Sequence, residues 1–596
     1  MSAGVARLAD AVRRYVEPGL HLHFASTPSR SNAAIREVAR AFRGQRPELT
    51  LSTSGFHSSA HLLGLLRLGR RYLACFFGDN YPAPRPSALY AALEREGATL
   101  EQWSLWTYVC ALRAGALGHD WAVTNSLAGT ELGAALARAG RYAEVPDPAS
   151  PDGSRRVGLV AALRPDVTFV HAAGADEEGN VLLSPPYSEG HWGALAARRG
   201  VIATVEQAPA ADPAGRLVGA LQIPAHRVLA ICVEPWGAHP QPLWALPAFE
   251  TRRYRDDFEH YARWRQLTED AEAFAGFTRA VLDAPDGGAA YRAWVGMNRL
   301  RALADVTAAP PAAAVAAPTR ASVPPAAGAA ATDASWVDRL VVSAARRIEA
   351  LVRAGGFRVA LAGIGHAFLA ARLAQLALAE AQVRLAVMVE IGLYDVACDA
   401  GTSGFLLAWD NVDRARRLSS VEDVLGTHAC GAANACLGIL GAAQVDGTGS
   451  LNSSRLADGR PLVGSGGACD VAAAAAEVMV LSRADPARLV RAVDFVTSPG
   501  ARVRSIVTDL GTLVRDGAGA DWRLDALAPA ACAEGARPVA RPAPEARRAA
   551  AQALAARCGW TFDIPDEVPP PAAITPVERD RLEALDPDGS QRRRAA

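Results

Sequence analysis

A segment rich in alanine and proline divides this chain into two parts. Residues 306–335 read VTAAPPAAAVAAPTRASVPPAAGAAATDAS and carry almost no charge. The segment shows no apolar periodicity, and its prolines would interrupt a helix because they lack a backbone N–H. We expect a semi-extended linker here. The chain should then form two bodies, residues 1–305 and 336–596, each long enough to bury its own core.

The overall composition is typical of a soluble globular protein and excludes several functions. Half of the 596 residues are hydrophobic, and 62 basic residues balance 62 acidic ones. Such a balance gives no electrostatic attraction to nucleic acid or to a membrane surface. The sequence contains no lysine, so neither a lysine Schiff base nor a P-loop lysine is available. It shows no signal peptide and no run of about 18 apolar residues, so we expect a cytoplasmic protein.

Nine cysteines are scattered along the chain, with no CxxC pair and no His/Cys cluster at metal-ligand spacing. Thiols in this pattern are typical of small buried residues in a reducing compartment. We therefore expect no metal site and no permanently bound cofactor.

Short apolar runs alternate with helical patterns through the N-terminal part. Asn32–Phe42 has helical spacing with Asn32 as a candidate cap, and Tyr254–Val281 is also strongly helical. The strand-like runs are Leu20–Ala25, Leu49–Ser52, Tyr72–Phe77, Val167–His171, Val201–Val205 and Val228–Val233. Strands that alternate with helices form parallel sheets, so we predict a doubly wound open α/β fold. We expect His239, in the loop after the last strand, to be held by backbone hydrogen bonds.

The C-terminal part repeats this alternation and adds two glycine-rich turns. Gly363 and Gly365 follow a predicted strand and precede a helix at Ala367–Glu380. The second turn, Gly464–Ala468, precedes an apolar run, Val471–Leu481, that predicts a helix. Backbone N–H groups in such turns can face an anion. GxG alone is a weak signal, and the GxGxxG fingerprint of dinucleotide binding is absent.

One carboxylate stands at the end of a strongly apolar strand candidate. Leu385–Val389 runs directly into Glu390, and Gly392 follows two residues later. An unbroken apolar run suits a strand buried on both faces of a parallel sheet, and ligands bind beyond the carboxyl ends of such strands. Gly392 permits a sharp turn and the close approach of a ligand to the backbone. Glu390 is therefore a catalytic candidate, and a glutamate that merely reaches solvent is the alternative.

Several motifs occur in the order found in a known family. They are EIG (Glu390–Gly392), GAAQVDGTGSLNSS (Gly441–Ser454), GSGGACD (Gly464–Asp470) and VDFVTSPG (Val493–Gly500) in the C-terminal part, with RPDVTFVHA (Arg164–Ala172) and WGAHP (Trp236–Pro240) in the N-terminal part. The first four resemble the β subunit of family I CoA-transferases, the glutaconate type in particular. The last two resemble the α subunit. The resemblance covers nearly the whole chain and implies that the linker fuses an α-like domain to a β-like domain.

The resemblance implies an enzyme that moves coenzyme A (CoA) between an acyl-CoA and a carboxylic acid. Glu390 matches the nucleophile of the family, which forms an acyl-glutamyl anhydride and then a glutamyl-CoA thioester. Backbone N–H groups would stabilise the oxyanions. The residues expected to supply these groups and to bind CoA are Gly464, Ser465, Gly466, Gly467, Ala468, Gly363 and Gly365.

The resemblance also places Glu390 at an interface between the two halves, where a substrate pocket is expected. Its candidate residues are Ser26, Ser54 and His57, which are polar and lie at strand ends, together with Gln444. Because the family pairs αβ units, we expect a homodimer of the fused chain.

Departures from the family pattern lie around the expected pocket, so they bear on the substrate more than on the fold. His23–Ala34 lacks the glycine pair of the family's first turn, and Gly363–Ala367 lacks its proline. Relatives on this fold decarboxylate or hydrolyse CoA esters, so an acyl-CoA decarboxylase or C–C hydrolase with Glu390 as general base is the alternative. A non-catalytic protein that binds CoA esters is a third possibility. Retention of Glu390 favours transfer.

Overall fold

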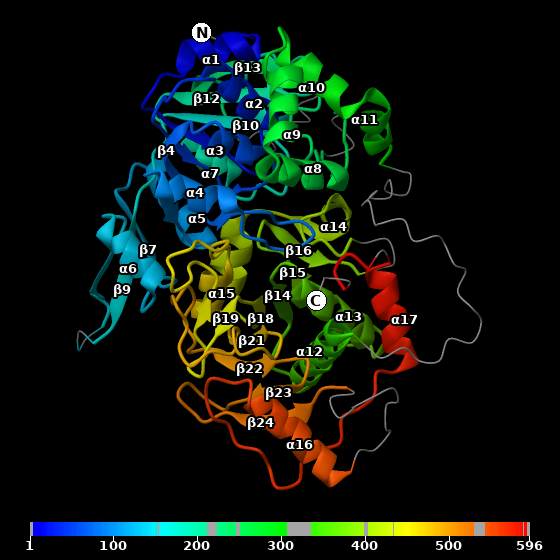
Figure 1. The fold of residues 1–596 in the computed structure, drawn as a ribbon. Coiled ribbons are helices and arrows are strands. Elements are labelled where there is room, and N and C mark those ends of the chain that lie inside the picture. Colours follow the sequence, from blue (N-terminus) through cyan, green and yellow to red (C-terminus); the bar gives the residue numbers. More distant parts are fainter. Residues whose placement is uncertain are drawn as a thin grey trace.

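The computed structural model describes residues 4–592, apart from 151, 153, 211–222, 246–250, 307–334, 399–402, 433, 530–542 and 588. The expected linker, residues 306–335, therefore lies almost wholly outside the described residues. The parts on either side of it are here called the N-terminal half (residues 4–306) and the C-terminal half (residues 335–592). In Figure 1 the N-terminal half, coloured blue to green, lies above the C-terminal half.

An eight-stranded sheet forms the centre of the N-terminal half. Its order is β13-β12-β10-β1-β2-β4-β6, with β11 attached to β10. The strands are β1 (His21–Phe24), β2 (Leu49–Ser52), β4 (Gly69–Ala74), β6 (Thr99–Gln102), β10 (Val167–Ala175), β11 (Val181–Leu183), β12 (Gly200–Val205) and β13 (Val228–Val233). All pairs except β10–β11 are parallel. The parallel sheet expected from the alternating pattern is confirmed.

Helices cover this sheet, and a small antiparallel sheet projects from its side. The helices are α1 (Leu8–Tyr15), α2 (Asn32–Ala41), α3 (His61–Leu65), α4 (Ala88–Arg95), α5 (Leu105–Ala116), α6 (Glu131–Arg138), α7 (Gly190–Leu195), α8 (Phe258–Glu269), α9 (Ala271–Phe277), α10 (Gly287–Val295) and α11 (Met297–Ala304). The small sheet contains β7 (Trp121–Thr124), β9 (Arg156–Ala161) and β8 (Tyr142–Pro146), and it lies beside α6 in Figure 1. Two short strands, β3 (Gly55–Phe56) and β5 (Phe76–Phe77), pair in parallel.

The expected cap of α2 is wrong. The residue at the N-cap position is Ser31, and its side chain makes no capping hydrogen bond. Asn32 is fully buried and its amide donates instead to Ala238 O and to Gln241 Oε1. The amide ties α2 to the loop after β13, so a tertiary contact takes precedence over the local cap.

A seven-stranded sheet forms the centre of the C-terminal half, in the order β15-β14-β18-β21-β22-β23-β24. Its strands are β14 (Val359–Ala362), β15 (Ala386–Met388), β18 (Cys436–Gly441), β21 (Glu477–Leu481), β22 (Val503–Val507), β23 (Gly511–Val514) and β24 (Arg523–Leu527). Pairing is parallel from β15 to β22 and antiparallel from β22 to β24. Two hairpins accompany it, β16 (Leu393–Val396) with β17 (Ala415–Leu418) and β19 (Gln444–Val445) with β20 (Leu451–Asn452).

The helices of the C-terminal half are α12 (Trp336–Arg353), α13 (His366–Glu380), α14 (Trp409–Asp413), α15 (Ala468–Ala474), α16 (Pro544–Ala555) and α17 (Pro576–Leu585). The prediction of one helix over Val471–Leu481 is wrong, because α15 ends at Ala474 and β21 begins at Glu477. Val478, Met479 and Val480 are fully buried between β18 and β22. Packing inside the sheet outweighs the helical preference of the preceding alanines.

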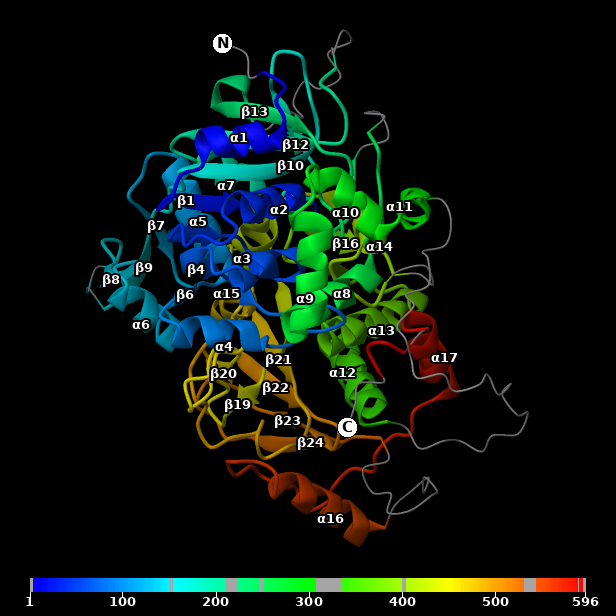
Figure 2. The same cartoon turned by 45° about the horizontal axis from the view of Figure 1, so that its top comes forward.

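The carboxyl ends of strands from both sheets meet where the halves are in contact. One cluster of buried side chains crosses this boundary and joins Leu73 and Trp103 of the N-terminal half to Met388 and Leu425 of the C-terminal half. Helix α15 of the C-terminal half contacts α5 of the N-terminal half, which lies above it in Figures 1 and 2. None of the described helices is both long and apolar enough to cross a membrane.

Candidate active site

A cavity of about 490 Å³ lies between the two halves. The N-terminal half lines it with residues that follow β2 and β4, including Ser54 and Cys75, and the C-terminal half with residues that follow β14 and β18, including Gly363 and Ala442. Strand ends of two α/β sheets therefore form its walls, which is where open sheets bind ligands. Among the described lining residues, the acidic side chain is Glu390 and the single arginine is Arg488.

Glu390 lies two residues beyond the end of β15, as the sequence predicted. Its Oε2 accepts a hydrogen bond of 2.9 Å from the backbone N–H of Gly467. Gly392, in the same turn, has φ +115°, and a Cβ there would lie 2.5 Å from Ser419 O. We expected a ligand to approach the backbone at Gly392. In the structure the backbone of Ser419 does so instead, and this contact fixes the turn that places Glu390 at the cavity.

The surroundings of Glu390 favour the protonated carboxyl more than water does. Burial is the main cause and raises the pKa of Glu390 to about 7; the Gly467 N–H opposes this shift, and the Asp470 carboxylate adds to it. Asp470 is itself fully buried and has its pKa raised to about 6, mainly by burial. Glu390 therefore changes charge near neutral pH, in the range that suits a nucleophile or a general base.

The loop Val463–Ala468 uses most of its backbone groups to hold itself in place. Gly466 N–H donates to Cys75 O at 2.9 Å, while Val463 O accepts from Phe77 N–H at 2.7 Å and Gly466 O from Leu105 N–H at 2.8 Å. These bonds join the loop to the N-terminal half.

Within the loop, the backbone N–H groups available to an oxyanion are few. Gly464 N–H donates to Ser453 O and Ala468 N–H to Ser465 O. Gly467 N–H faces Glu390, and Ser465 N–H donates to no other described backbone group. All five predicted donors line the cavity, namely Gly464, Ser465, Gly466, Gly467 and Ala468. Because the other three N–H groups are bonded within the protein, the candidate oxyanion donors are Ser465 and Gly467.

The remaining predicted residues divide into those at the cavity and those away from it. Gly363, Gly365, Ser54 and His57 line it. Burial, with a smaller contribution from the Arg30 charge, holds the pKa of His57 well below its usual range, so this imidazole is neutral.

Ser26 and Gln444 are not among the residues that line the cavity. Ser26 is buried beside Thr53, with 3.2 Å between the two hydroxyl oxygens. Gln444 donates to Asp494 Oδ2 at 2.8 Å and accepts from Asn452, so it fixes the β19–β20 hairpin. Both therefore support the fold in this structure.

Three residues at or beside the cavity were not predicted from the sequence. Asp470 joins the halves: its carboxylate accepts from Ser104 Oγ at 2.7 Å and from Trp106 N–H at 2.9 Å. Cys75 and Arg488 line the cavity. Asp470 ends the GSGGACD motif, but the motif does not show which groups its carboxylate bonds, and no motif marks Cys75 or Arg488, since all three positions depend on how the halves pack.

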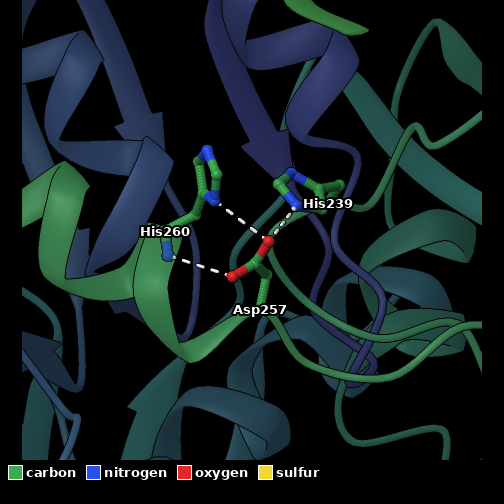
Figure 3. Close-up of side chains that lie close together, drawn as sticks. All are labelled: His239, Asp257 and His260. Atoms are coloured by element: carbon green, nitrogen blue, oxygen red, sulfur yellow. Dashed lines mark hydrogen bonds and ion pairs between the residues drawn. The ribbon is translucent and has the colours of Figure 1, made fainter. Parts of the chain in front are cut away.

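A second polar cluster lies outside the cavity, in the N-terminal half (Figure 3). His239 Nε2 and His260 Nδ1 bond Asp257 Oδ2 at 3.1 and 3.0 Å, and these three groups are close enough together to hold a metal ion. Arg299 also donates to both oxygens of Asp257, at 3.1 and 2.8 Å. This guanidinium already balances the carboxylate, so the cluster is best explained as a structural network that joins α8 and α11.

The expectation that backbone hydrogen bonds hold His239 is wrong for its ring, because both ring nitrogens contact side chains. Its Nδ1 lies 2.8 Å from Tyr291 Oη, opposite its contact with Asp257. Burial lowers the pKa of His239 to about 4 despite the neighbouring carboxylate. For Asp257, burial acts to raise the pKa, but the bonds from His239, His260 and Arg299 outweigh it and hold the pKa well below its usual range.

Comparison with known proteins finds similarity to one family in the N-terminal half. Residues 5–224 match the model of the family described as Coenzyme A transferase. Over these residues the N-terminal half is similar to coenzyme A transferases. A curated relative, one of the subunits of 3-oxoadipate CoA-transferase from Pseudomonas knackmussii, is 29% identical over 164 residues, which are 28% of this chain and 52% of that protein. The chain thus spans about half the length of the curated relative that it matches.

Solved structures extend the similarity to both halves. The apoenzyme of an acyl-CoA transferase from Escherichia coli O157:H7 covers 99% of this chain and 97% of its own, with 14% identity and a TM-score of 0.60. A thioester complex of that enzyme with CoA covers 97% of this chain and 96% of its own, with 14% identity and a TM-score of 0.58. Glutaconate coenzyme A-transferase from Acidaminococcus fermentans covers 50% of this chain and 95% of its own, with 24% identity and a TM-score of 0.44. The fold of the whole chain is that of a CoA-transferase, with two α/β bodies as expected.

Proposed function

We propose that this protein transfers CoA between an acyl-CoA and a carboxylic acid, with Glu390 as nucleophile. The observation that carries the proposal is the Glu390 carboxylate, held by one backbone N–H at the wall of a cavity between two CoA-transferase-like halves. The N-terminal half, the C-terminal half and the linker between them are then an α-like domain, a β-like domain and their fusion. A homodimer in the cytoplasm remains our expectation.

The proposed reaction exchanges one bond at each step. A Glu390 oxygen attacks the thioester carbonyl, the C–S bond breaks, and CoA thiolate leaves a mixed anhydride behind. The thiolate then attacks the Glu390 carbonyl, which releases the free acid and leaves a glutamyl-CoA thioester. The acceptor acid repeats both steps in reverse. A structure of the acyl-CoA transferase from E. coli is described as a thioester complex with CoA, and this supports the proposal of a thioester intermediate here.

The Ser465 and Gly467 N–H groups are placed to stabilise the oxyanions that these attacks create. Gly467 N–H donates to the nucleophile before reaction, and it can stay bonded to the Glu390 carboxyl group as the anhydride and then the glutamyl-CoA thioester form. Each such donor stabilises a transition state by roughly 3 kcal/mol. Glycine at position 467 leaves room for the carboxylate, since a Cβ there would lie 2.2 Å from Glu390 Oε2.

The test is isotope exchange between a free acid and an acyl-CoA. A panel of acyl-CoA esters is incubated with ¹³C-labelled carboxylic acids, and the products are identified by mass spectrometry. Transfer predicts labelled acyl-CoA and release of the original acid in equal amounts. Consumption of acyl-CoA without incorporation of any labelled acid would contradict transfer.

A second candidate function is decarboxylation or C–C hydrolysis of an acyl-CoA, with Glu390 as general base. The pKa of about 7 favours it, since a general base works best when its pKa lies near the operating pH. This second function forms no glutamyl-CoA thioester. It is identified if the acyl-CoA is consumed, no labelled acid is incorporated into acyl-CoA, and Glu390 carries no CoA.

The raised pKa of Glu390 predicts a particular pH dependence of activity. The reactive form is the carboxylate, so kcat/KM should increase as the pH rises through about 7. Between pH 6 and pH 8 the increase should be about tenfold, since the ionised fraction changes by that factor. The measurement is kcat/KM for an acyl-CoA across pH 5 to 9. A constant rate from pH 5.5 upward would mean that Glu390 is already ionised and that its burial has been overcome.

A further inference from the structure

A short segment after α17 returns to the boundary between the halves. We call its residues 589–592 the strap, and in Figure 1 the red trace that follows α17 runs toward that boundary. The Asp586 carboxylate holds the base of the strap, since Oδ1 accepts from Gln591 N–H at 3.2 Å and Oδ2 accepts from Arg592 N–H at 3.0 Å. Because Asp586 is itself buried, the strap is packed into the C-terminal half.

Gln591 connects the strap to both halves. Its side chain is buried, and Nε2 donates to Pro82 O of the N-terminal half at 2.9 Å. Its backbone O accepts from Nε2–H of His366, which lines the cavity in the C-terminal half, at 3.1 Å. Glycine at position 404 leaves room for the side chain, because a Cβ there would lie 3.2 Å from Gln591 Cγ. One residue of the strap therefore bonds a loop of one half and the cavity wall of the other.

The loop that Gln591 bonds forms part of the cavity wall. We call residues 79–86 the wall loop, and four of them line the cavity: Asn80, Ala83, Pro84 and Pro86. At its base, Asp79 and Arg85 exchange two backbone hydrogen bonds of 2.9 Å. On one side the ring of Tyr81 packs edge-on against Phe405 of the C-terminal half, with 5.3 Å between the ring centres. The wall loop is thus held at its base and along one side.

The tip of the wall loop has few hydrogen bonds of its own. Pro82, Ala83 and Pro84 form no backbone–backbone hydrogen bond with another described residue, and the two prolines have no N–H to donate. The Gln591 amide supplies the bond that Pro82 O accepts. The tip also lies close to the first glycine turn of the C-terminal half, since a Cβ at Gly365 would be 3.9 Å from Ala83 Cβ. Gln591 therefore holds the tip where the walls of the two halves meet.

We infer that Gln591 is a positioning residue, which keeps the tip of the wall loop at the cavity and so sets the affinity for acyl-CoA. The inference rests on the proposed function, because acyl-CoA is the substrate of that reaction. Gln591 is not among the described residues that line the cavity, so it acts through Pro82. Without its N–H the tip leaves its place in a fraction of the molecules, and acyl-CoA binds only those in which the wall is complete. The step at Glu390 is unchanged once substrate is bound.

Substitution of Gln591 should change KM and leave kcat unchanged. Gln591→Ala removes the whole amide, whereas Gln591→Met keeps a similar size and removes only the polar group. Both should raise KM for acyl-CoA about fivefold, the effect of one neutral hydrogen bond. The matched control is Gln45→Ala, because Gln45 is an exposed glutamine that also donates to a backbone oxygen, Ala41 O, at 3.4 Å. Gln45→Ala should keep the KM of the parent.

Hydrogen–deuterium exchange, followed by mass spectrometry of peptides, examines the wall loop without any turnover. The N–H groups of Asp79 and Arg85 should exchange faster in both Gln591 variants than in the parent, because a released tip lets the base of the loop open. Peptides from β12, inside the sheet of the N-terminal half, should exchange as in the parent. Gln45→Ala should match the parent in the wall loop.

Two results would overturn the inference directly: the KM of the parent in Gln591→Ala, or the exchange of the parent in its wall loop. Parent-like behaviour of Gln591→Met would also overturn it, since packing and not the N–H would then matter. Faster exchange throughout the protein would mean that Gln591 serves overall stability instead. Failure of the proposed function looks different. The parent would then exchange no acid with any acyl-CoA, while hydrogen exchange in the wall loop would still distinguish the Gln591 variants from Gln45→Ala.

Discussion

Replacement of Glu390 by glutamine should abolish transfer while leaving the protein folded. Glutamine keeps the size and the hydrogen-bond acceptor that Gly467 N–H requires, but its amide is a poor nucleophile. We expect exchange to fall by at least about a thousandfold, as for other enzymes that lose a covalent nucleophile. Incubation of the parent with an acyl-CoA and no acceptor should label Glu390 as its CoA thioester. Borohydride reduction or hydroxylamine, followed by peptide mapping, should locate the label between Val389 and Ile391, and the variant should carry none. Label on another residue, or exchange that survives, would show that the nucleophile is elsewhere.

The same variant also has a predictable stability. Because the folded protein raises the pKa of Glu390 from 4.5 to about 7, it holds this proton more tightly than the unfolded chain does. The free energy of unfolding therefore declines as pH rises from 4.5 through 7, by up to about 3 kcal/mol at 1.36 kcal/mol per pKa unit. Glu390→Gln removes this titration. It should be more stable than the parent above pH 7 and equal to it below about pH 4.5, as measured by chemical denaturation at both pH values.

Gly467→Ala should cause the second large loss of activity. Its φ of −87° is open to alanine, so the effect comes from the Cβ, which would meet Glu390 Oε2 at 2.2 Å and Leu425 Cδ1 at 3.2 Å. The carboxylate must move, and displacement of a reacting group by about an ångström can lower a rate roughly a hundredfold. The measurements are kcat/KM and the rate of Glu390 labelling, with thermal unfolding to confirm the fold.

Gly441→Ala is the control for this substitution. Gly441 lines the same cavity, but a Cβ there would lie 4.0 Å from its nearest neighbour, Leu481 O, which is ordinary contact. It should retain most of the parent's activity. If Gly467→Ala were as active as Gly441→Ala, the carboxylate would not need the position seen in this structure.

The sequence predicted the sheet strands better than the polar residues around the cavity. Runs such as Val201–Val205 and Val228–Val233 are long, apolar and bounded by turns, so their strands follow from local pattern alone. Val471–Leu481 failed because its alanines favour a helix, while Val478 and Val480 find partners in two neighbouring strands that the local sequence does not show. Competition between local propensity and sheet packing was decided by distant residues.

In the candidate site, too, the sequence does not show which distant groups a side chain meets. Glu390 and Gly467 were predicted as site residues because each stands at a junction of strand or helix that a motif marks, and both line the cavity. Ser26 and Gln444 also stand at strand ends, but their side chains bond Thr53 and Asp494. Side chains alternate between the two faces of a strand, so a prediction that is wrong by one residue places a side chain on the wrong face, among different neighbours. Arg488 was missed because nothing nearby in sequence indicates that it borders a cavity.

The backbone bonds between the loop Val463–Ala468 and the N-terminal half have a consequence for how the protein behaves on dilution. Gly466, whose neighbour Gly467 bonds Glu390, is fastened to Cys75 and Leu105 of the other half. Separate subunits would lose this fastening as their concentration fell below the dissociation constant. In one chain the two surfaces meet at an effective concentration that the solution cannot change, commonly in the millimolar range for tethered partners. Specific activity should then stay constant down to enzyme concentrations at which an unlinked pair would separate.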